Sequence, residues 1–359
     1  GNIRIMIPLY KPFMPEQLPE IETILHSGAL AYGKWGRAFE TSLITFTGAP
    51  HAAVVNSFNA AVQIALLTLG IGHGDEVITS PQSCLASNMP ILSVGAKVVW
   101  ADIDPHTGTL SPESVRRKIT PATRVIFHNH HCGYPGYIDE INAIGREKGL
   151  PVIDDCIEAF GAQYKGRTMG SLDTDVSLFS FQTVRLPNTI DGGAVCFRDP
   201  ALHQKACRLR DLGVDRKTFR DSMGEISPLS DVKQAGMGVT MNEVSSYIGY
   251  LQMQQIESLL AIQQANAQQW IHKLALKEEY QPLGRTEIKP NYWVFGLRTG
   301  KGRTDAILNF RAQGYYASSV HLPNYMYSVF GNRGDDLVGA KEFYDHYLAL
   351  PSGWWLDNK

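Results

Sequence analysis

Between about residue 50 and residue 200 the sequence repeats one pattern: a short apolar run, a turn rich in Gly, Pro, Ser or Asp, and an amphipathic stretch. The apolar runs predict buried strands, and the amphipathic stretches predict helices. Strands are expected in HAAVVNS, DEVITS, AKVVWADID, RVIFHNH, LPVIDD, VSLFSF and GGAVCFRD, and helices in NAAVQIALLTLG, LASNMPILSVG, SPESVRRKI and IDEINAIGREKG. Strands that alternate with helices predict an α/β fold with a mostly parallel, doubly wound sheet.

The pattern changes after about residue 240. The stretch MNEVSSYIGYLQMQQIESLLAIQQANAQQWIHKLAL has apolar residues at helical spacing and almost no charge, which predicts one long helix. NYWVFGLRT, RTDAILNFRAQG and YYASSVHLP then predict a strand, a helix and a strand. We expect a large domain over residues 1–240 and, over residues 241–359, a linking helix with a small C-terminal α/β domain.

Composition excludes several classes of function. With 33 basic and 35 acidic residues the formal charge is −2, which provides no electrostatic surface for nucleic acid or an anionic membrane. No apolar run reaches the roughly 20 residues that span a bilayer, and the start of the chain lacks the pattern of a secretory signal, so a cytoplasmic protein is expected. The five cysteines form no CxxC pair and are expected to be reduced thiols.

Ligands of parallel sheets gather at the carboxyl ends of the strands, so the residues that follow each strand are the candidates for chemistry. In VIDDCIEAFGA a strand ends at Asp154 and Asp155, and Glu158 follows. A buried carboxylate at this place can hold a proton on a pyridinium nitrogen, as an electron-sink cofactor requires. The alternative is a pair of helix N-cap residues.

Two further strand ends suggest anion sites. In SLFSFQTVRLPNTIDGGAV, Ser180 ends a strand and Arg185 follows five residues later, before two glycines that permit close backbone approach. The alternative there is a turn with an exposed arginine. In VVNSFNAAVQ a strand passes into a helix through Ser57, Phe58 and Asn59, so the free amides of the helix could bind phosphate. Asn59 as a simple N-cap fits equally well.

A fourth strand end is HNHHCGYPG. His128 and His130 share one face of a strand and are expected to converge, with Cys132 following on that face. His131 lies between these residues. Three such soft ligands could bind zinc, but no second cluster at metal-ligand spacing completes a site, so we expect no metal ion. These residues are interpreted as lining a pocket or supporting a turn.

These landmarks together carry a resemblance. SGALAYGKWGRAFE, GIGHGDEVITS, VGAKVVWADIDP, GYPGYIDEINAI, VIDDCIEAFGAQYKGRTMG, FSFQTVRLPNTIDGGAV, MNEVSSYIGYLQ and ALPSGW resemble, in unbroken order from about Pro8 to Pro351, the DegT/DnrJ/EryC1/StrS sugar aminotransferases. The resemblance implies the fold type I architecture of enzymes dependent on pyridoxal phosphate (PLP). It also implies a homodimer with active sites at the interface, and transfer of an amino group to a keto-sugar that is often nucleotide-linked.

The resemblance assigns roles to several residues. Asp155 falls on the acid that pairs with the pyridine nitrogen, Glu158 on a glutamine beside the cofactor hydroxyl, and Ser180 on the serine of the phosphate cup. The lysine that forms the Schiff base in the family is replaced here by Arg185. A guanidinium has a pKa above roughly 12 and no free amine lone pair, so it cannot form that bond.

Other positions also depart from the family. The Ser-Gly-Thr pattern of the phosphate cup is here Ser57, Phe58 and Asn59. Cys84 stands where an aromatic residue commonly stacks on the cofactor ring, and Gly238 stands where an asparagine usually reaches the phosphate of the neighbouring subunit.

Three hypotheses follow. The first is an enzyme of polysaccharide or secondary-metabolite sugar synthesis that binds PLP or its aminated form (PMP) noncovalently, with Arg185 as an anion anchor and His130 or Glu158 moving protons. The second is an inactive homologue that serves as a sugar-nucleotide sensor or as the partner of an active paralogue. The third is a PMP-dependent sugar dehydratase, as in relatives whose lysine is replaced by histidine.

Overall fold

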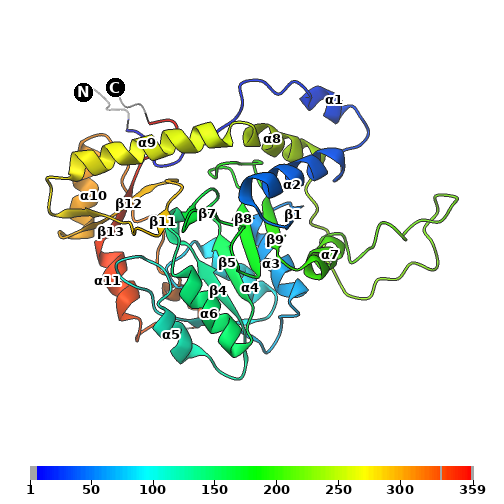
Figure 1. The fold of residues 1–359 in the computed structure, drawn as a ribbon, viewed down its shortest axis with the longest axis horizontal. Coiled ribbons are helices and arrows are strands. Elements are labelled where there is room, and N and C mark those ends of the chain that lie inside the picture. The colour runs from blue at the N-terminus through cyan, green and yellow to red at the C-terminus, as the bar shows by residue number, and fades with distance from the viewer. Residues whose placement is uncertain (1–5, 332–333, 357–359) are drawn as a thin grey trace.

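The computed structural model describes residues 6–331 and 334–356. Its centre is a seven-stranded sheet in the order β1-β9-β8-β5-β4-β2-β3 (Figure 1). β9 is antiparallel to both of its neighbours, and all other pairs are parallel, so the predicted mostly parallel sheet is confirmed. In chain order the strands are β1 (His51–Val55), β2 (Glu76–Thr79), β3 (Lys97–Trp100), β4 (Thr123–Asn129), β5 (Val152–Cys156), β8 (Val176–Ser180) and β9 (Gly193–Phe197).

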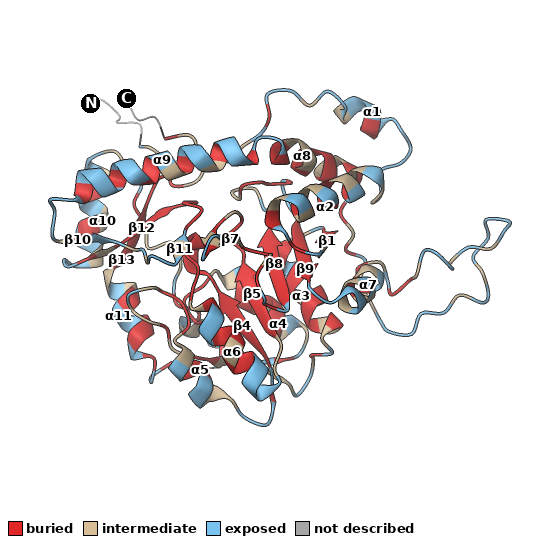
Figure 2. Cartoon of the chain, viewed as in Figure 1, coloured by how far each residue is buried: buried red, intermediate tan, exposed pale blue. Residues whose placement is uncertain are grey.

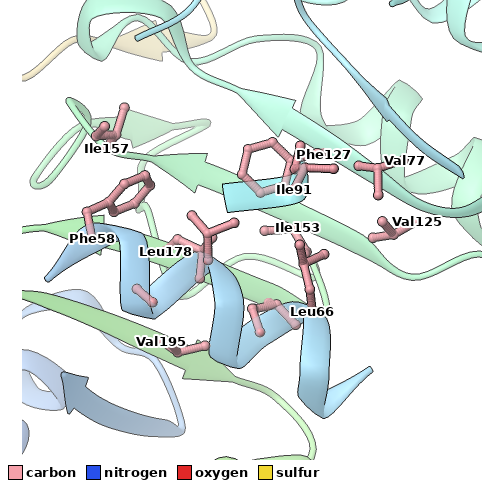
Figure 3. Close-up of a cluster of buried hydrophobic side chains, with 14 of the residues drawn as sticks. Phe58, Leu66, Val77, Ile91, Val125, Phe127, Ile153, Ile157, Leu178 and Val195 are labelled. Atoms are coloured by element: carbon pink, nitrogen blue, oxygen red, sulfur yellow. The ribbon is translucent and has the colours of Figure 1, made fainter. Parts of the chain in front are cut away.

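Helices cover both faces of this sheet, because alternate residues of each strand point to opposite sides. On one face, α3 (Phe58–Thr68) and α4 (Leu85–Ser93) pack against the strands. Phe58 and Leu66 of α3 lie over Leu178 and Val195 there (Figure 3). These side chains are almost completely buried and form the largest hydrophobic cluster of the described residues.

The opposite face carries α2 (Lys34–Thr47) and α8 (Glu243–Met253) at one end of the sheet, and α5 (Pro112–Lys118) and α6 (Ile138–Lys148) at the other. Phe39 and Leu43 of α2 belong to the same cluster as Val54 of β1. Ile141 of α6 packs with Ile126 of β4. The sheet is therefore buried on both sides, as its colour in Figure 2 shows.

The C-terminal part has its own sheet, β10-β12-β13, with β10 (Tyr280–Pro282), β12 (Phe295–Thr299) and β13 (Tyr347–Leu350). A third sheet has the order β11 (Ile288–Lys289), β6 (Gln163–Tyr164) and β7 (Arg167–Thr168), and the pairing of β11 with β6 joins the two halves of the chain. The domain boundary at residue 240 stays a prediction. The remaining elements are α1 (Ile21–Leu25), α7 (Pro200–Leu209), α10 (Arg303–Ala312), α11 (Val338–His346), η1 (His131–Gly133), η2 (Asn324–Met326) and η3 (Ser328–Phe330).

Two sequence predictions were wrong in this half. The single long helix is two helices, α8 and α9 (Ile256–Leu274), separated at Gln254 and Gln255. Neither residue is Gly or Pro, so no helix-breaking signal marks the separation. The strand expected in YYASSVHLP forms only isolated bridges at Tyr315 and Ser318, and Val320 adopts a left-handed φ of 64° that interrupts extended backbone.

No described helix has the length and apolar character needed to cross a membrane.

A buried ion pair ties α2 to β1 and to the end of α7. The Glu40 carboxylate accepts hydrogen bonds from Arg210 Nη1 at 2.7 Å and from Val54 N at 2.9 Å. The Arg210 guanidinium also donates to Val54 O and stacks on Tyr32. Only 7% of the Arg210 side chain and 12% of the Glu40 side chain are exposed. Loss of either partner would leave a buried charge without compensation.

Arg210→Met is expected to lower the free energy of unfolding by about 3–5 kcal/mol, because it strands the buried Glu40 carboxylate. The control is Arg117→Met, which breaks an exposed pair with Glu113 and should cost less than about 1 kcal/mol. Urea unfolding of both variants makes the comparison. Equal losses would contradict a structural role for the Glu40 pair.

Candidate active site

Near the end of β5, Asp154 and Asp155 face opposite sides of the sheet. The Asp155 carboxylate accepts hydrogen bonds from Asn129 Nδ2 at 2.9 Å and from Ile157 N at 3.2 Å. Asn129 lies beside it at the end of β4, in register. A turn rather than a helix follows β5, so the interpretation of Asp154 and Asp155 as N-cap residues was wrong.

The Asp155 carboxyl is completely buried. Burial raises its pKa to about 6, and the hydrogen bonds from its neighbours oppose this rise only in part. The site therefore holds a carboxyl whose charge needs a partner. A protonated ring nitrogen is a group that would supply one.

Glu158 lies at the centre of a second group of charges. Its Oε1 accepts a hydrogen bond from Cys132 N at 3.0 Å, and its Oε2 lies 2.6 Å from His321 Nε2 and 4.0 Å from Arg185 Nη1. Burial alone would raise the pKa of Glu158, but His321 and Arg185 lower it to about 2. Glu158 is therefore an anion at every physiological pH.

Arg185 is an almost buried cation, with 10% of its side chain exposed. Its guanidinium carbon lies 4.7 Å from the ring centre of Trp293. The Tyr10 ring stacks on Trp293, with 4.8 Å between the ring centres. The Arg185 side chain donates no hydrogen bond to any residue in the described ranges, and its Nε is buried. The alternative of a turn with an exposed arginine was wrong.

The passage from β1 to α3 forms the third predicted site. Ser57 caps α3, because its hydroxyl accepts a hydrogen bond from Ala60 N at 3.0 Å. The interpretation of Asn59 as the N-cap was therefore wrong, and its amide donates to Gln63 instead. Phe58 is buried in the main cluster. A Cβ on Gly193 would lie 2.9 Å from Ser57 O, which confirms the expected close approach of the backbones.

The other predicted cofactor residues occupy separate positions around these groups. Ser180 is buried at the end of β8, and its hydroxyl accepts a hydrogen bond from Gln182 N at 3.3 Å. Cys84 precedes α4, and burial together with the Glu158 charge raises the pKa of its thiol to about 11. Gly238 bridges Asp211 in the backbone and is exposed.

The structure does not bring His130 to Glu158. His130 Nε2 lies 2.9 Å from Asp154 Oδ1, and Gly136 N donates to His130 Nδ1 at 2.9 Å. The rings of His128 and His130 converge at 4.4 Å, as predicted. Cys132 does not follow them, because it contacts Glu158 instead.

Sequence analysis missed three side chains that complete the site: Tyr10, Trp293 and His321. They lie far from Arg185 and Glu158 along the chain, and only tertiary contacts bring them together. His321 stands in a segment that was interpreted only as a strand. Its one available signal was the presence of a titratable residue in an otherwise uncharged segment.

A family model described as the DegT/DnrJ/EryC1/StrS aminotransferase family matches residues 13–359. The chain belongs to this family. The fold agrees with solved structures of similar proteins. The sugar aminotransferase CalS13 from Micromonospora echinospora is 28% identical with a TM-score of 0.91, and the match covers 98% of this chain and 96% of that one. AtS13 from Actinomadura melliaura is 29% identical with a TM-score of 0.91, and covers 99% and 96% of the two chains.

A third similar structure, Spr1654 from Streptococcus pneumoniae, has been solved in a PLP form and a PMP form. It is 22% identical to this aminotransferase homologue, with TM-scores of 0.88 and 0.89 for the two forms, and the matches cover 98% of this chain and 95% of that one.

Asp155→Asn is expected to stabilise the protein above pH 6. The folded-state pKa of about 6 lies above the usual 3.8, so ionisation of Asp155 destabilises the folded chain. This destabilisation is absent below pH 3.8, grows as the pH rises, and is complete above about pH 6. The cost is at most ~3 kcal/mol. The introduced amide keeps a hydrogen-bond partner. Asn129 Oδ1 has no partner now, and a flip of the Asn129 amide would let it accept from the NH2 group of the new asparagine.

Thermal unfolding between pH 4 and pH 8 measures this difference. The native chain should lose stability relative to the variant as the pH rises through about 6. A variant that is less stable than the native chain at pH 8 would contradict the assignment of a raised pKa to Asp155.

Proposed function

We propose that this protein binds PLP or PMP noncovalently, together with a nucleotide-linked keto-sugar of polysaccharide or secondary-metabolite synthesis, and that it does not perform lysine-dependent transamination. The observation that carries the proposal is the position of Arg185. Its guanidinium is held by Trp293 and Glu158, at the place where the family has its lysine. A group that stays protonated cannot attack a carbonyl or accept a proton.

The residues fit a noncovalently held cofactor and do not fit a covalently held one. The buried Asp155 carboxylate would pair with the ring nitrogen. Ser180 and the amides at the start of α3, which Gly193 approaches closely, would hold the phosphate. When bound, such a cofactor supplies an electron sink. The space among Glu158, Ser180, Arg185 and Trp293 measures only about 10 Å³, so we infer that Arg185 shifts when the ring enters.

The chain's own residues would orient the ligand more readily than they would move protons. The Glu158 carboxylate stays ionised between His321 and Arg185, so it positions a cation or a donor. His130 cannot replace the missing lysine as a base, since both of its ring nitrogens have partners away from Glu158. This arrangement also suits the alternative of an inactive homologue that acts as a sugar-nucleotide sensor or as the partner of an active paralogue.

A PMP-dependent sugar dehydratase is the second candidate, and one observation favours it. His321 Nε2 lies 2.6 Å from Glu158 Oε2, so an imidazole is present in the pocket although it is not at the lysine position. Incubation with PMP and a nucleotide-linked keto-sugar, followed by mass spectrometry, separates the candidates. Loss of water would favour the dehydratase, and an unchanged sugar would favour a binding role.

Titration with PLP and then PMP is expected to give saturable binding, followed by cofactor absorbance and by quenching of tryptophan fluorescence. Borohydride should trap no cofactor on the native chain, because Arg185 forms no Schiff base. Arg185→Lys should become covalently labelled, and Asp155→Asn should weaken binding of both forms by at least about tenfold through loss of the ring-nitrogen contact.

Two outcomes would contradict the proposal. An amino-transfer rate comparable to that of lysine-bearing relatives would show that Arg185 does not prevent transamination. Absence of binding for both PLP and PMP would remove the cofactor from the proposal and favour the inactive homologue.

We also propose a homodimer with its sites at the interface. The segment 212–237 extends away from the rest of the chain beyond α7 (Figure 1). It exposes large apolar side chains, among them Met223 at 80% and Leu229 at 93%. Exposed apolar groups on a projecting segment are typical of a surface that is covered in an assembly.

Leu229→Glu is expected to shift the protein from dimer to monomer, because it places a charge in the proposed interface. Leu276→Glu is the matched control, since Leu276 is 96% exposed but lies outside this segment. Sedimentation velocity at several concentrations reports the change. Equal behaviour of the two variants would place the interface elsewhere.

A further inference from the structure

Cys132, Glu158 and His321 bring a thiol, a carboxylate and an imidazole together inside the pocket. One ligand atom from each lies within 4.8 Å of the other two. The three residues come from η1, from the turn after β5 and from the segment before η2, so the fold and not a local motif assembles them. Cys132 and Glu158 are buried, and His321 is partly exposed. An ion could therefore enter from the His321 side.

The backbone around this group holds the donors in place. Cys132 N donates a hydrogen bond to Glu158 Oε1 at 3.0 Å. This bond holds the Glu158 carboxylate against the residue that carries the thiol. Cys132 has φ 53° and ψ 28°, a left-handed conformation that is unfavourable for a residue with a side chain. Such strain persists only where the surrounding structure imposes it, and it is frequent at functional sites.

A further imidazole lies beside Cys132, outside the group whose ligand atoms all lie within 4.8 Å of one another. His131 Nε2 lies 3.7 Å from Cys132 Sγ, and the His131 ring meets the His321 ring edge to face at 5.8 Å. Tetrahedral zinc with Zn–N and Zn–S bonds of about 2.0 and 2.3 Å separates its ligand atoms by roughly 3.3–3.5 Å. The Cys132 and His131 donors need to move by only a few tenths of an ångström to reach that separation.

Charge and orientation also suit a divalent cation. A Cys132 thiolate and the Glu158 carboxylate would place two negative charges beside Zn²⁺ and the Arg185 cation, and binding would release the thiol proton. Arg185 lies 4.0 Å from Glu158 Oε2, where it can orient the carboxylate as an outer partner of a metal ligand.

We propose that Cys132, Glu158 and His321 form a zinc-binding site. The proposal goes beyond the proposed function and departs from the sequence expectation of no metal, because His321 is distant in the sequence from the other donors. Coordination requires that His321 Nε2 present its lone pair to the ion. Its hydrogen bond to Glu158 is then replaced by a shared metal ion.

In a second group of convergent donors, the histidine nitrogen that faces the other ligands cannot present a lone pair to an ion. His128, His130 and Asp154 also lie within 4.8 Å of one another and are fully buried. However, Gly136 N donates to His130 Nδ1, so the neutral ring carries its proton on Nε2, which faces Asp154. That proton occupies the direction a metal would need. We therefore assign the zinc ion to the Cys132 group alone.

Cobalt titration of chelator-treated, cofactor-free protein tests the proposal. We expect one equivalent of Co²⁺ to give a thiolate-to-metal charge-transfer band and tetrahedral ligand-field bands, both removed by one equivalent of Zn²⁺. Cys132→Ser should abolish the charge-transfer band, and His321→Gln should weaken Zn²⁺ binding at least about tenfold. Cys207→Ser is the matched control, because Cys207 lies beside His203 on α7 and should leave binding unchanged.

Circular dichroism confirms that each variant is folded, and Glu158→Gln provides a second variant if Cys132→Ser does not fold. Absence of stoichiometric Zn²⁺ and of the Co²⁺ band in the native chain would overturn the proposal. A band that survives Cys132→Ser but disappears in Cys207→Ser would overturn it by placing the metal elsewhere. Because no PLP or PMP is present, failure of cofactor binding does not alter the result.

Discussion

The pocket depends on the buried Glu158 carboxylate. It accepts a hydrogen bond from Cys132 N, lies 2.6 Å from His321 Nε2 and faces the Arg185 guanidinium at 4.0 Å. A buried carboxylate without partners would cost several kcal/mol, so these neighbours determine its charge and its direction. The resemblance to the family places Glu158 at a glutamine position and Arg185 at the lysine position. We interpret the two residues as coupled, since their opposite charges compensate each other.

The parallel sheet explains why these groups meet. The carboxyl ends of the neighbouring strands β4, β5 and β8 lie together, and they carry Asn129, Asp155 and Ser180 to the same side of the sheet. The period of two along β5 sends Asp154 to the other side, where it binds His130. One position along a strand therefore separates a residue available to a ligand from one that supports the core. The C-terminal half then closes the pocket with Trp293 and His321.

The sequence was sufficient for the strands of the central sheet and for the family. Apolar runs and turn residues located these strands, and strand-end chemistry predicted Asp155, Ser180 and Arg185 as site residues. It could not show that Trp293 stacks on Arg185, because contacts between residues so far apart in the chain leave no periodic signal. The partners of His130 and the separation of α8 from α9 were equally hidden. Both depend on tertiary packing, which overrides local preference.

A double-mutant cycle for Arg185 and Glu158, with the free energy of unfolding as the measured quantity, shows whether the two charges compensate each other. The single variants are Arg185→Met and Glu158→Gln, each of which removes one of the two charges, and the double variant removes both. If the two residues compensate each other, the cycle should give a coupling energy of about 1–3 kcal/mol, with the double variant more stable than the sum of the single losses predicts. Additive losses, with no coupling, would contradict the account.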